Sequence, residues 1–410
     1  MSTPAPENEH LGEHLGEHPN ARPGEHLVRD AVGPPITVHQ ASATIGVGIN
    51  SLMILGVLPV LLGALADEHR LNAGGIGLIA ALEVLSMGLA TAAAGAALKP
   101  RRLRTIGVTA SLILAAADVA SGRAAGPLLF VLRAAAGATE GILLWITVSM
   151  IARTVTPERW AGVFFTTQTL AQLLLAVALA EWIMPRWGAM GGFVSLAAAS
   201  LTGVAPALFS PSQFAPLPLA PGEGGAPPLR GWLALLATLI YVAAGGAVGV
   251  YLQPLAHQAG LDADVARTAL WTSLAAQVVG ASLATALAGR VSYFVVFIFS
   301  SASYLAVWWV LSLHSPGWVF IGANAFVGLT GLFLAPFLVP FTIEADPSRR
   351  AALQSGAAQL LGGALGPLLA GLVVSDANVH GALLLGAVML LIGLAGVAAL
   401  RFTRARGGEA

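Results

Sequence analysis

Cysteine is absent from this sequence of 410 residues, and charged residues are scarce. Without a thiol the chain can form neither disulfide bonds nor thiolate metal sites, so cysteine usage gives no information on the redox compartment. Asp, Glu, Lys and Arg together make up 10% of the residues, whereas a soluble domain usually contains roughly 25%. Hydrophobic residues make up 56%. This composition excludes most soluble proteins and indicates a chain embedded in lipid.

Long apolar stretches recur from about residue 36 onward. Each has roughly 18 to 25 residues, enough at about 1.5 Å per residue to cross a hydrocarbon core of ~30 Å. We predict an all-α integral membrane protein with twelve transmembrane helices, at 37–64, 75–98, 104–122, 127–152, 162–184, 189–209, 231–256, 266–289, 291–312, 316–343, 350–374 and 380–402. No cleavage-site pattern precedes the first span, so we expect this span to act as the insertion signal.

The placement of the basic residues predicts the orientation. The total of 20 basic and 20 acidic residues cancels and gives no indication of a nucleic-acid partner. With a cytoplasmic amino terminus, fifteen Lys and Arg residues fall on the inner side and four on the outer side. Loops that stay in the cytoplasm carry this excess of basic residues. We therefore expect both termini inside and a multi-pass protein of the cytoplasmic (inner) membrane.

The chain divides into two similar halves. Residues 211–230 are rich in Pro and Gly and are typical of a connector. They separate a bundle at 36–210 from a bundle at 231–403, with tails at 1–35 and 404–410. A shift of 190 residues places Gly141 on Gly331 and Pro157 on Pro347. Such duplication is typical of secondary transporters with a site near the bilayer midplane, although Gly- and Ala-rich helices can also match by chance.

This pattern resembles the major facilitator superfamily over about residues 36 to 405. RAAAG, from Arg133 to Gly137, looks like the family's signature Arg with Gly four residues later, and GALGPLLAG, from Gly363, is similar to its eleventh helix. The resemblance implies two six-helix bundles and a fourth helix that lines a central cavity. Two features depart from the family. Lys99 stands where an Asp is usual in the loop after the second span, and the fifth span lacks the Gly-Pro signature of many drug antiporters.

Charged residues within the spans are the first candidates for function, because each costs at least ~2.5–3.5 kcal/mol near the bilayer centre. Arg133 and Glu140 lie seven residues apart, on one face of the fourth span. We predict that Arg133 binds an anionic group of the substrate through its planar guanidinium. Glu140 and Glu83 are the predicted proton-coupling residues. The alternative is that Arg133 pairs with a carboxylate and only holds helices together.

Neutral polar residues in the spans form a second set of candidates. We predict substrate contacts by Asn50 and Gln168 in the first half and by Tyr241 and Asn324 in the second. Equally, such groups can form hydrogen bonds between neighbouring helices. Pro336 and Pro340 should kink the tenth span, either as a gate or as a packing bend.

The amino-terminal EHLGEHLGEH, from Glu9 to His18, has the residue types of a metal-binding segment. Histidines spaced by four would share one face of a helix, a geometry that suits Zn, Ni or Cu. Glycine at every fourth position argues against a stable helix, and the spans contain no matching His or acid cluster. We expect a disordered cytoplasmic tail and assign no metal site, with a metal or pH sensor as the alternative.

These patterns together predict a secondary active transporter that moves a small organic molecule by alternating access and is coupled to protons. Import and export are both open. The alternatives are an efflux pump of the same fold and a transporter-like membrane sensor with the His-rich tail as its input. No catalytic pair clusters at the end of a span, so we expect no enzyme and no cofactor. The expected partners are the small-molecule substrate, protons and the lipid bilayer, with no nucleic acid, and the protein is expected to act as a monomer.

Overall fold

The computed structural model describes residues 27–28, 36–71, 73–217, 226–313, 315–374 and 379–407. Most of the His-rich tail and part of the predicted connector lie outside the described residues. Strand β1 (Leu27–Val28), in the predicted tail, pairs antiparallel with β2 (Ile36–Thr37), which follows the tail, and Leu27 lies opposite Thr37. The rest of the described chain is almost entirely helical.

The first half of the chain folds into one bundle. Its elements are α1 (Val38–Asp67), α2 (Ala73–Ala97), α3 (Leu103–Arg123), α4 (Pro127–Ile151), α5 (Pro157–Ala178), a π-helical turn η1 (Leu179–Ile183), α6 (Met184–Thr202) and the short α7 (Val204–Phe209). Pro127 and Pro157 occupy the first turns of α4 and α5, where a backbone N–H would have no acceptor within the helix, so that its absence in proline costs nothing.

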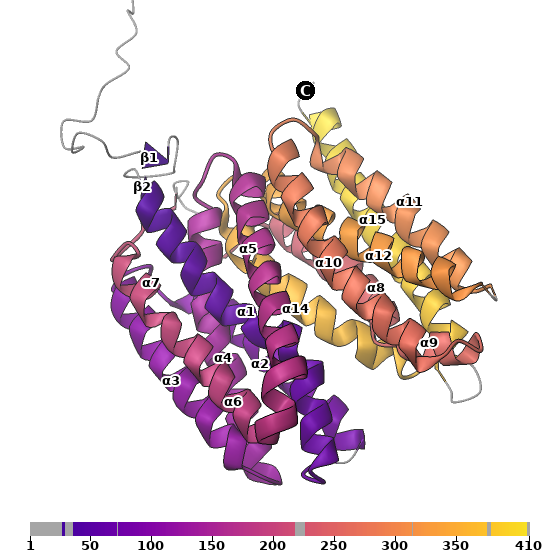
Figure 1. Cartoon of the computed structure of the whole chain (residues 1–410). Coiled ribbons are helices and arrows are strands. Elements are labelled where there is room, and N and C mark those ends of the chain that lie inside the picture. Colours follow the sequence, from indigo (N-terminus) through magenta and orange to yellow (C-terminus); the bar gives the residue numbers. More distant parts are fainter. Residues whose placement is uncertain are drawn as a thin grey trace, which may run out of the picture.

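The second half forms a bundle beside the first (Figure 1). Its elements are α8 (Leu229–Gly249), α9 (Leu252–Gln258), α10 (Ala263–Leu287), α11 (Tyr293–Leu311), α12 (Gly317–Leu334), a 3-10 turn η2 (Ala335–Phe337), α13 (Leu338–Ala345), α14 (Arg350–Ala370) and α15 (His380–Gly407). The predicted kink in the tenth span is observed, because the helix is interrupted at η2, which contains Pro336.

Ten segments of the described chain are long and apolar enough to cross a membrane. One of them, Pro157–Phe209, has 53 residues and contains both α5 and α6. The backbone leaves helical geometry inside it at Gly188, whose φ of 56° is a left-handed conformation that favours glycine. Helix α14 is not among the ten.

With ten such segments and this composition, the chain is a multi-pass membrane protein.

The glycines four residues after Arg133 and Asn324 allow close helix contacts in the two halves. A Cβ atom at Gly137 of α4 would lie 2.3 Å from the carbonyl oxygen of Glu83 on α2. A Cβ atom at Gly328 of α12 would lie 2.4 Å from the carbonyl oxygen of Ser273 on α10. Small residues at such positions let backbones approach in membrane bundles. The Gly four residues after Arg133 thus places Glu83 within reach of this arginine.

The two bundles have separate apolar cores and meet mainly along α2, α5, α10 and α14. One cluster of buried side chains comes mostly from α1–α7, and the other comes from α8–α15. Val339 of α13 and Leu360 of α14 belong to the first cluster although they lie in the second half of the sequence. Figure 1 shows α14 next to the first bundle, and it shows that α1 begins and α15 ends at the same end of the molecule. We call this the terminal end.

The loop between α2 and α3 and the first turn of α3 form hydrogen bonds with the segment that follows α7. Phe214 N donates to the carbonyl of Pro100 at 3.0 Å, and Arg104 Nε donates to the carbonyl of Ser210 at 2.7 Å. Arg153, just after α4, donates to the carbonyl of Ala215 at 2.9 Å. Burial lowers the pKa of Arg153 to about 10, so its guanidinium stays charged at neutral pH.

Candidate functional site: a central cavity and a buried charge cluster

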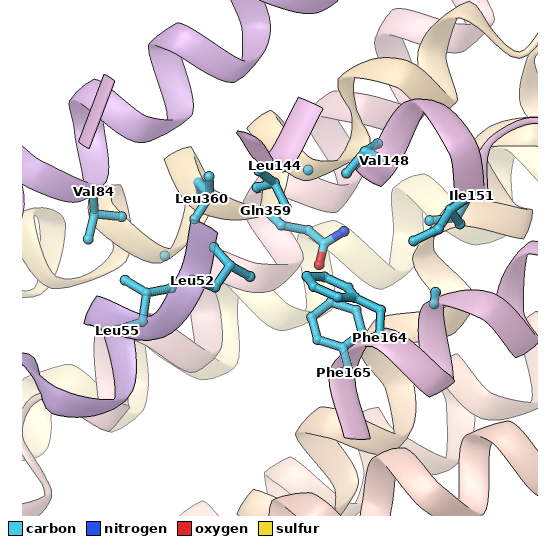
Figure 2. A pocket seen from close by; sticks show the side chains of 14 residues that line it. Leu52, Leu55, Val84, Leu144, Val148, Ile151, Phe164, Phe165, Gln359 and Leu360 are labelled. Atoms are coloured by element: carbon cyan, nitrogen blue, oxygen red, sulfur yellow. The ribbon is translucent and has the colours of Figure 1, made fainter. Parts of the chain in front are cut away.

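A cavity of about 320 Å³ lies between the two halves. Its walls come from α1, α2, α4 and α5 of the first half and from α13 and α14 of the second. The close view in Figure 2 shows Leu52 and Leu55 of α1 on one side and the rings of Phe164 and Phe165 of α5 on another. The centroids of these two rings lie 5.2 Å apart. A molecule bound here would contact both bundles at once.

The cavity surface is apolar except for one side chain. Among the residues that line it, only Gln359 of α14 carries a polar side chain, and none is charged. Gln359 Nε2 donates a hydrogen bond to Ser355 Oγ, one turn earlier, at 3.3 Å. Figure 2 shows the Gln359 amide directed toward the rings of Phe164 and Phe165.

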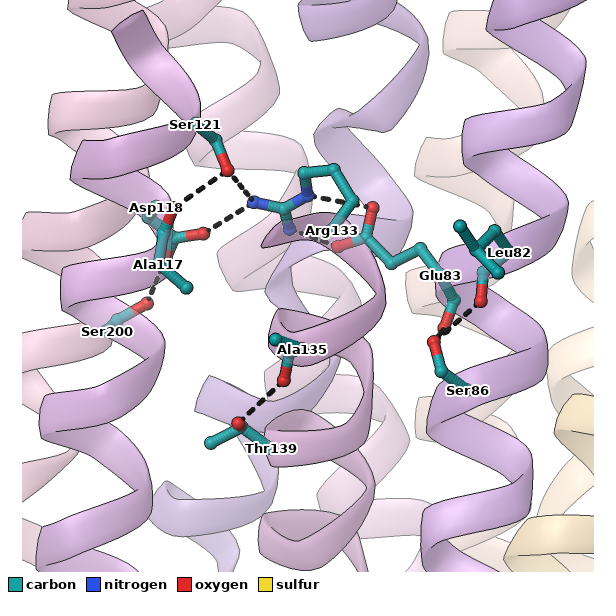
Figure 3. Close-up of polar contacts among 10 residues, drawn as sticks. All are labelled: Leu82, Glu83, Ser86, Ala117, Asp118, Ser121, Arg133, Ala135, Thr139 and Ser200. Atoms are coloured by element: carbon teal, nitrogen blue, oxygen red, sulfur yellow. Dashed lines mark hydrogen bonds and ion pairs between the residues drawn. The ribbon is translucent and has the colours of Figure 1, made fainter. Parts of the chain in front are cut away.

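A cluster of buried charges lies within the first bundle, around Arg133 of α4 (Figure 3). The Arg133 guanidinium donates through Nε and Nη2 to both carboxylate oxygens of Glu83 on α2. Its Nη1 donates to Asp118 Oδ1 on α3 at 2.8 Å. Ser200 of α6 donates to the other Asp118 oxygen at 2.8 Å. The Arg133 side chain is 1% exposed, and those of Glu83 and Asp118 are 0% exposed.

Arg133 thereby ties four helices together. Its guanidinium carbon also lies 5.5 Å from the ring centroid of Phe193 on α6. A guanidinium that binds two carboxylates in a buried site has most of its donors occupied. In this conformation the geometry matches the alternative in which Arg133 pairs with carboxylates and holds helices together. The predicted contact between Arg133 and the substrate stays a prediction.

Glu140 lies on the same helix as Arg133, and among the described residues it forms no ion pair with a basic side chain. The residue is 1% exposed, and its Oε2 has no hydrogen-bond partner among the described residues. Glu140 interacts electrostatically with Glu83, Arg133 and Asp118. The cluster thus holds three carboxyl groups and one guanidinium. The roles of Glu140 and Glu83 in proton coupling stay predictions.

The four neutral residues predicted to contact substrate are buried within the bundles. Asn50 Nδ2 donates to the carbonyl of Ser200 at 3.0 Å, and the hydroxyls of Tyr241 and Ser301 lie 2.8 Å apart. Asn324 donates within its own helix to the carbonyl of Phe320 at 2.8 Å. Gln168 is 5% exposed. None of the four lines the cavity in this conformation, and their binding roles stay predictions.

Arg349 and Gly162 provide two of the contacts that join the halves at the terminal end. Arg349, which precedes α14, donates through Nη1 to the carbonyls of Ala152 at 2.9 Å and Thr154 at 2.6 Å, just after α4. Gly162 of α5 packs on α10, where an added Cβ would lie 3.0 Å from Thr285 Cα. Gly162 thus permits the close approach of these helices.

The described residues contain no group of three or more His, Cys, Asp or Glu that could hold a metal ion. The repeated EHLG segment lies outside the described residues, so its expected behaviour stays a prediction.

Comparison with known proteins identifies the fold. The structure is similar to that of FucP, a Major Facilitator Superfamily transporter solved in the outward conformation, with a TM-score of 0.70. The identity is 14%, and the match covers 88% of this chain and 98% of that one. A second structure, of the E. coli fucose:proton symporter FucP, matches with the same values. No protein-family model matches the sequence, and no curated protein matches it. The chain therefore has the fold of major facilitator superfamily transporters.

Proposed function

We propose that this chain is a secondary active transporter that moves a small organic molecule across the cytoplasmic membrane by alternating access. The observation that carries the proposal is the cavity between the halves, whose walls come from both of them. Movement of one bundle against the other would change the membrane face to which such a cavity opens. The fold supports the same function, since the two FucP structures compared above are of transporters.

The proposed topology has twelve transmembrane helices and two cytoplasmic termini. Helices α5 and α6 share one of the ten apolar segments and would be separate spans, and α14, with 21 residues, would be a further span. The fifteen-to-four distribution of basic residues supports a cytoplasmic location for the terminal end. The bundles at 36–210 and 231–403 would be the two moving parts, joined by residues 211–230.

Proton coupling is proposed on the charge balance around Arg133. Glu83 and Asp118 share the one guanidinium, while Glu140 has an unpartnered oxygen. An ion without a partner in a membrane interior costs several kcal/mol. Glu140 is therefore the group that would carry a proton, and proton transfer to or from it would change the electrostatic balance that holds α2, α3 and α4 together. FucP itself is a fucose:proton symporter.

The test begins with the full chain in detergent and a thermal-shift screen against sugars, organic anions, organic cations and uncharged aromatic compounds. A compound that stabilises the protein is then followed in proteoliposomes under an imposed pH gradient. Glu140→Gln and Glu83→Gln should each remove the acceleration that the gradient gives. Proton coupling is excluded if both variants transport at the wild-type rate with the wild-type pH dependence.

A further inference from the structure

The lining of the central cavity carries information about the chemistry of what binds there. All but one of its lining side chains are aliphatic, aromatic or glycine, and they come from six helices. An ion moved from water into such a cavity loses its hydration without gaining a counter-charge, and the cost of this transfer is large. The cavity therefore selects against charged molecules.

Charged side chains nearby do not change this conclusion. Arg133, Glu83 and Glu140 are all absent from the cavity lining, and the first two bind each other within the first bundle. The Arg133 Nη1 is occupied by Asp118 at 2.8 Å. A substrate anion in the cavity would thus meet no free cation in this conformation.

Gln359 provides the one polar contact. Its amide has two N–H donors and a carbonyl acceptor, and the bond to Ser355 uses one donor. The carbonyl oxygen and the second N–H are left to bind a ligand. The ring of Phe164 faces the same space, as Figure 2 shows, and offers an apolar surface beside the polar group. Apolar walls with few placed polar groups are typical of small-molecule sites.

We infer that the cavity binds an uncharged, largely apolar molecule with one hydroxyl, carbonyl or amide group, and that Gln359 forms a hydrogen bond with that group. As the identity of the transported substrate, this inference rests on the proposed transport function. The volume of about 320 Å³ lies at the lower end of the roughly 300–1,000 Å³ of ligand pockets. The molecule is therefore small.

The test uses three probes that share one ring system: 2-naphthol, which is uncharged at neutral pH, naphthalene, and naphthalene-2-sulfonate. Binding to the full chain in lipid nanodiscs is measured by equilibrium dialysis, with empty nanodiscs as the correction for partition into lipid. Gly363→Leu is the blocking variant, because Gly363 lines the cavity and an added Cβ there meets nothing within 4 Å. Gly322→Leu on α12 is the matched control, since Gly322 is equally unobstructed but does not line the cavity.

We expect 2-naphthol to bind more tightly than naphthalene and naphthalene-2-sulfonate to bind least. Gly363→Leu should abolish binding, and Gly322→Leu should leave it unchanged. In Gln359→Leu, which keeps the size of the side chain, the preference for 2-naphthol over naphthalene should fall by about 2- to 10-fold, as expected for one hydrogen bond.

Tightest binding of the sulfonate, binding that survives Gly363→Leu, or no binding of any probe would overturn the inference. An unchanged preference in Gln359→Leu would remove the assigned role of Gln359. Failure of the proposed transport function would give a different experimental result from failure of this inference. In that case 2-naphthol binds in the cavity as described, while the two halves show no movement when it binds.

Discussion

At the scale of single residues, Arg133 holds the buried charge cluster together, because its guanidinium binds Glu83 on α2 and Asp118 on α3. Charged residues are rare within the spans, and this was enough to select Arg133, Glu83 and Glu140 as candidate functional residues. The partners of Arg133 were not predictable, because Glu83 and Asp118 lie on other helices and their approach depends on packing between α2, α3 and α4. Gln359 was not predicted to line the cavity, for the same reason. The sequence shows a polar residue in a glycine-rich helix and does not show that its side chain faces a cavity.

Replacing Arg133 by Met should strongly destabilise the protein. The variant leaves Glu83 and Asp118 buried without the guanidinium that they share, and breaking such a buried pair typically costs about 3–5 kcal/mol. We expect a clearly lower melting temperature in detergent. The triple variant Arg133→Met, Glu83→Gln, Asp118→Asn should recover much of the loss, because neither of the two carboxylates that the guanidinium bound is then left as a buried charge.

The matched control for this prediction is Arg186→Met. Arg186 is exposed, and its hydrogen bond within the described part of the chain goes to the carbonyl of Trp182, one turn earlier. Its loss should shift the melting temperature little. If Arg133→Met and Arg186→Met melt at the same temperature, the structural role assigned to Arg133 is wrong.

At the scale of helices, we expect the contacts at the terminal end to control whether the cavity opens there. The absence of cysteine makes the chain a ready background for labelling. Gly363→Cys places a thiol in the cavity, where an added Cβ meets nothing within 4 Å. The rate at which a membrane-impermeant maleimide, supplied on the terminal side, modifies this thiol reports opening at that end.

Gly162→Val should increase this labelling rate. The added Cβ would lie 3.0 Å from the Cα and backbone N of Thr285 on α10, so α5 and α10 must separate. Overpacking of this kind costs about 1–3 kcal/mol, which weakens the closed arrangement relative to an open one. Gly322→Val, at an exposed position with nothing within 4 Å of an added Cβ, should leave the rate unchanged. Equal rates in the two variants would show that the α5–α10 contact does not close the cavity.

Arg349→Gly should open the terminal end in the same assay. The variant removes the hydrogen bonds to Ala152 and Thr154 that join the halves. Glycine adopts the φ of 63° found at this position without strain. Arg102→Gly is the matched control, because Arg102 has a φ of 58° and likewise precedes a helix, but lies entirely within the first half. A labelling rate raised by both variants alike would point to backbone flexibility and not to the lost contact.

At the scale of the whole molecule, apolar length and the distribution of basic residues were enough to predict a helical membrane protein, and the resemblance of two short motifs indicated its fold. Element boundaries were less accurate. The predicted span at 231–256 is divided into α8 and α9, and α5 begins at Pro157, five residues before the predicted start at 162. The resemblance implied a central cavity lined by the fourth helix, and α4 does line the cavity. Its other lining residues could not be predicted, because hydropathy does not distinguish a helix face that lines a cavity from one that faces lipid.

Opposite movements at the two ends of the α5–α10 interface would test alternating access most directly. Spin labels at Arg159→Cys and Arg290→Cys mark the terminal end, and labels at Arg186→Cys and Asp264→Cys mark the other end. All four positions are exposed. Distances between the labels in each pair are measured by double electron–electron resonance in nanodiscs, with and without 2-naphthol and at acidic and alkaline pH. We predict that one distance lengthens as the other shortens, and that Glu140→Gln removes the response to pH. Distances that stay constant under all conditions, or that change in the same direction at both ends, would contradict the proposed transport mechanism.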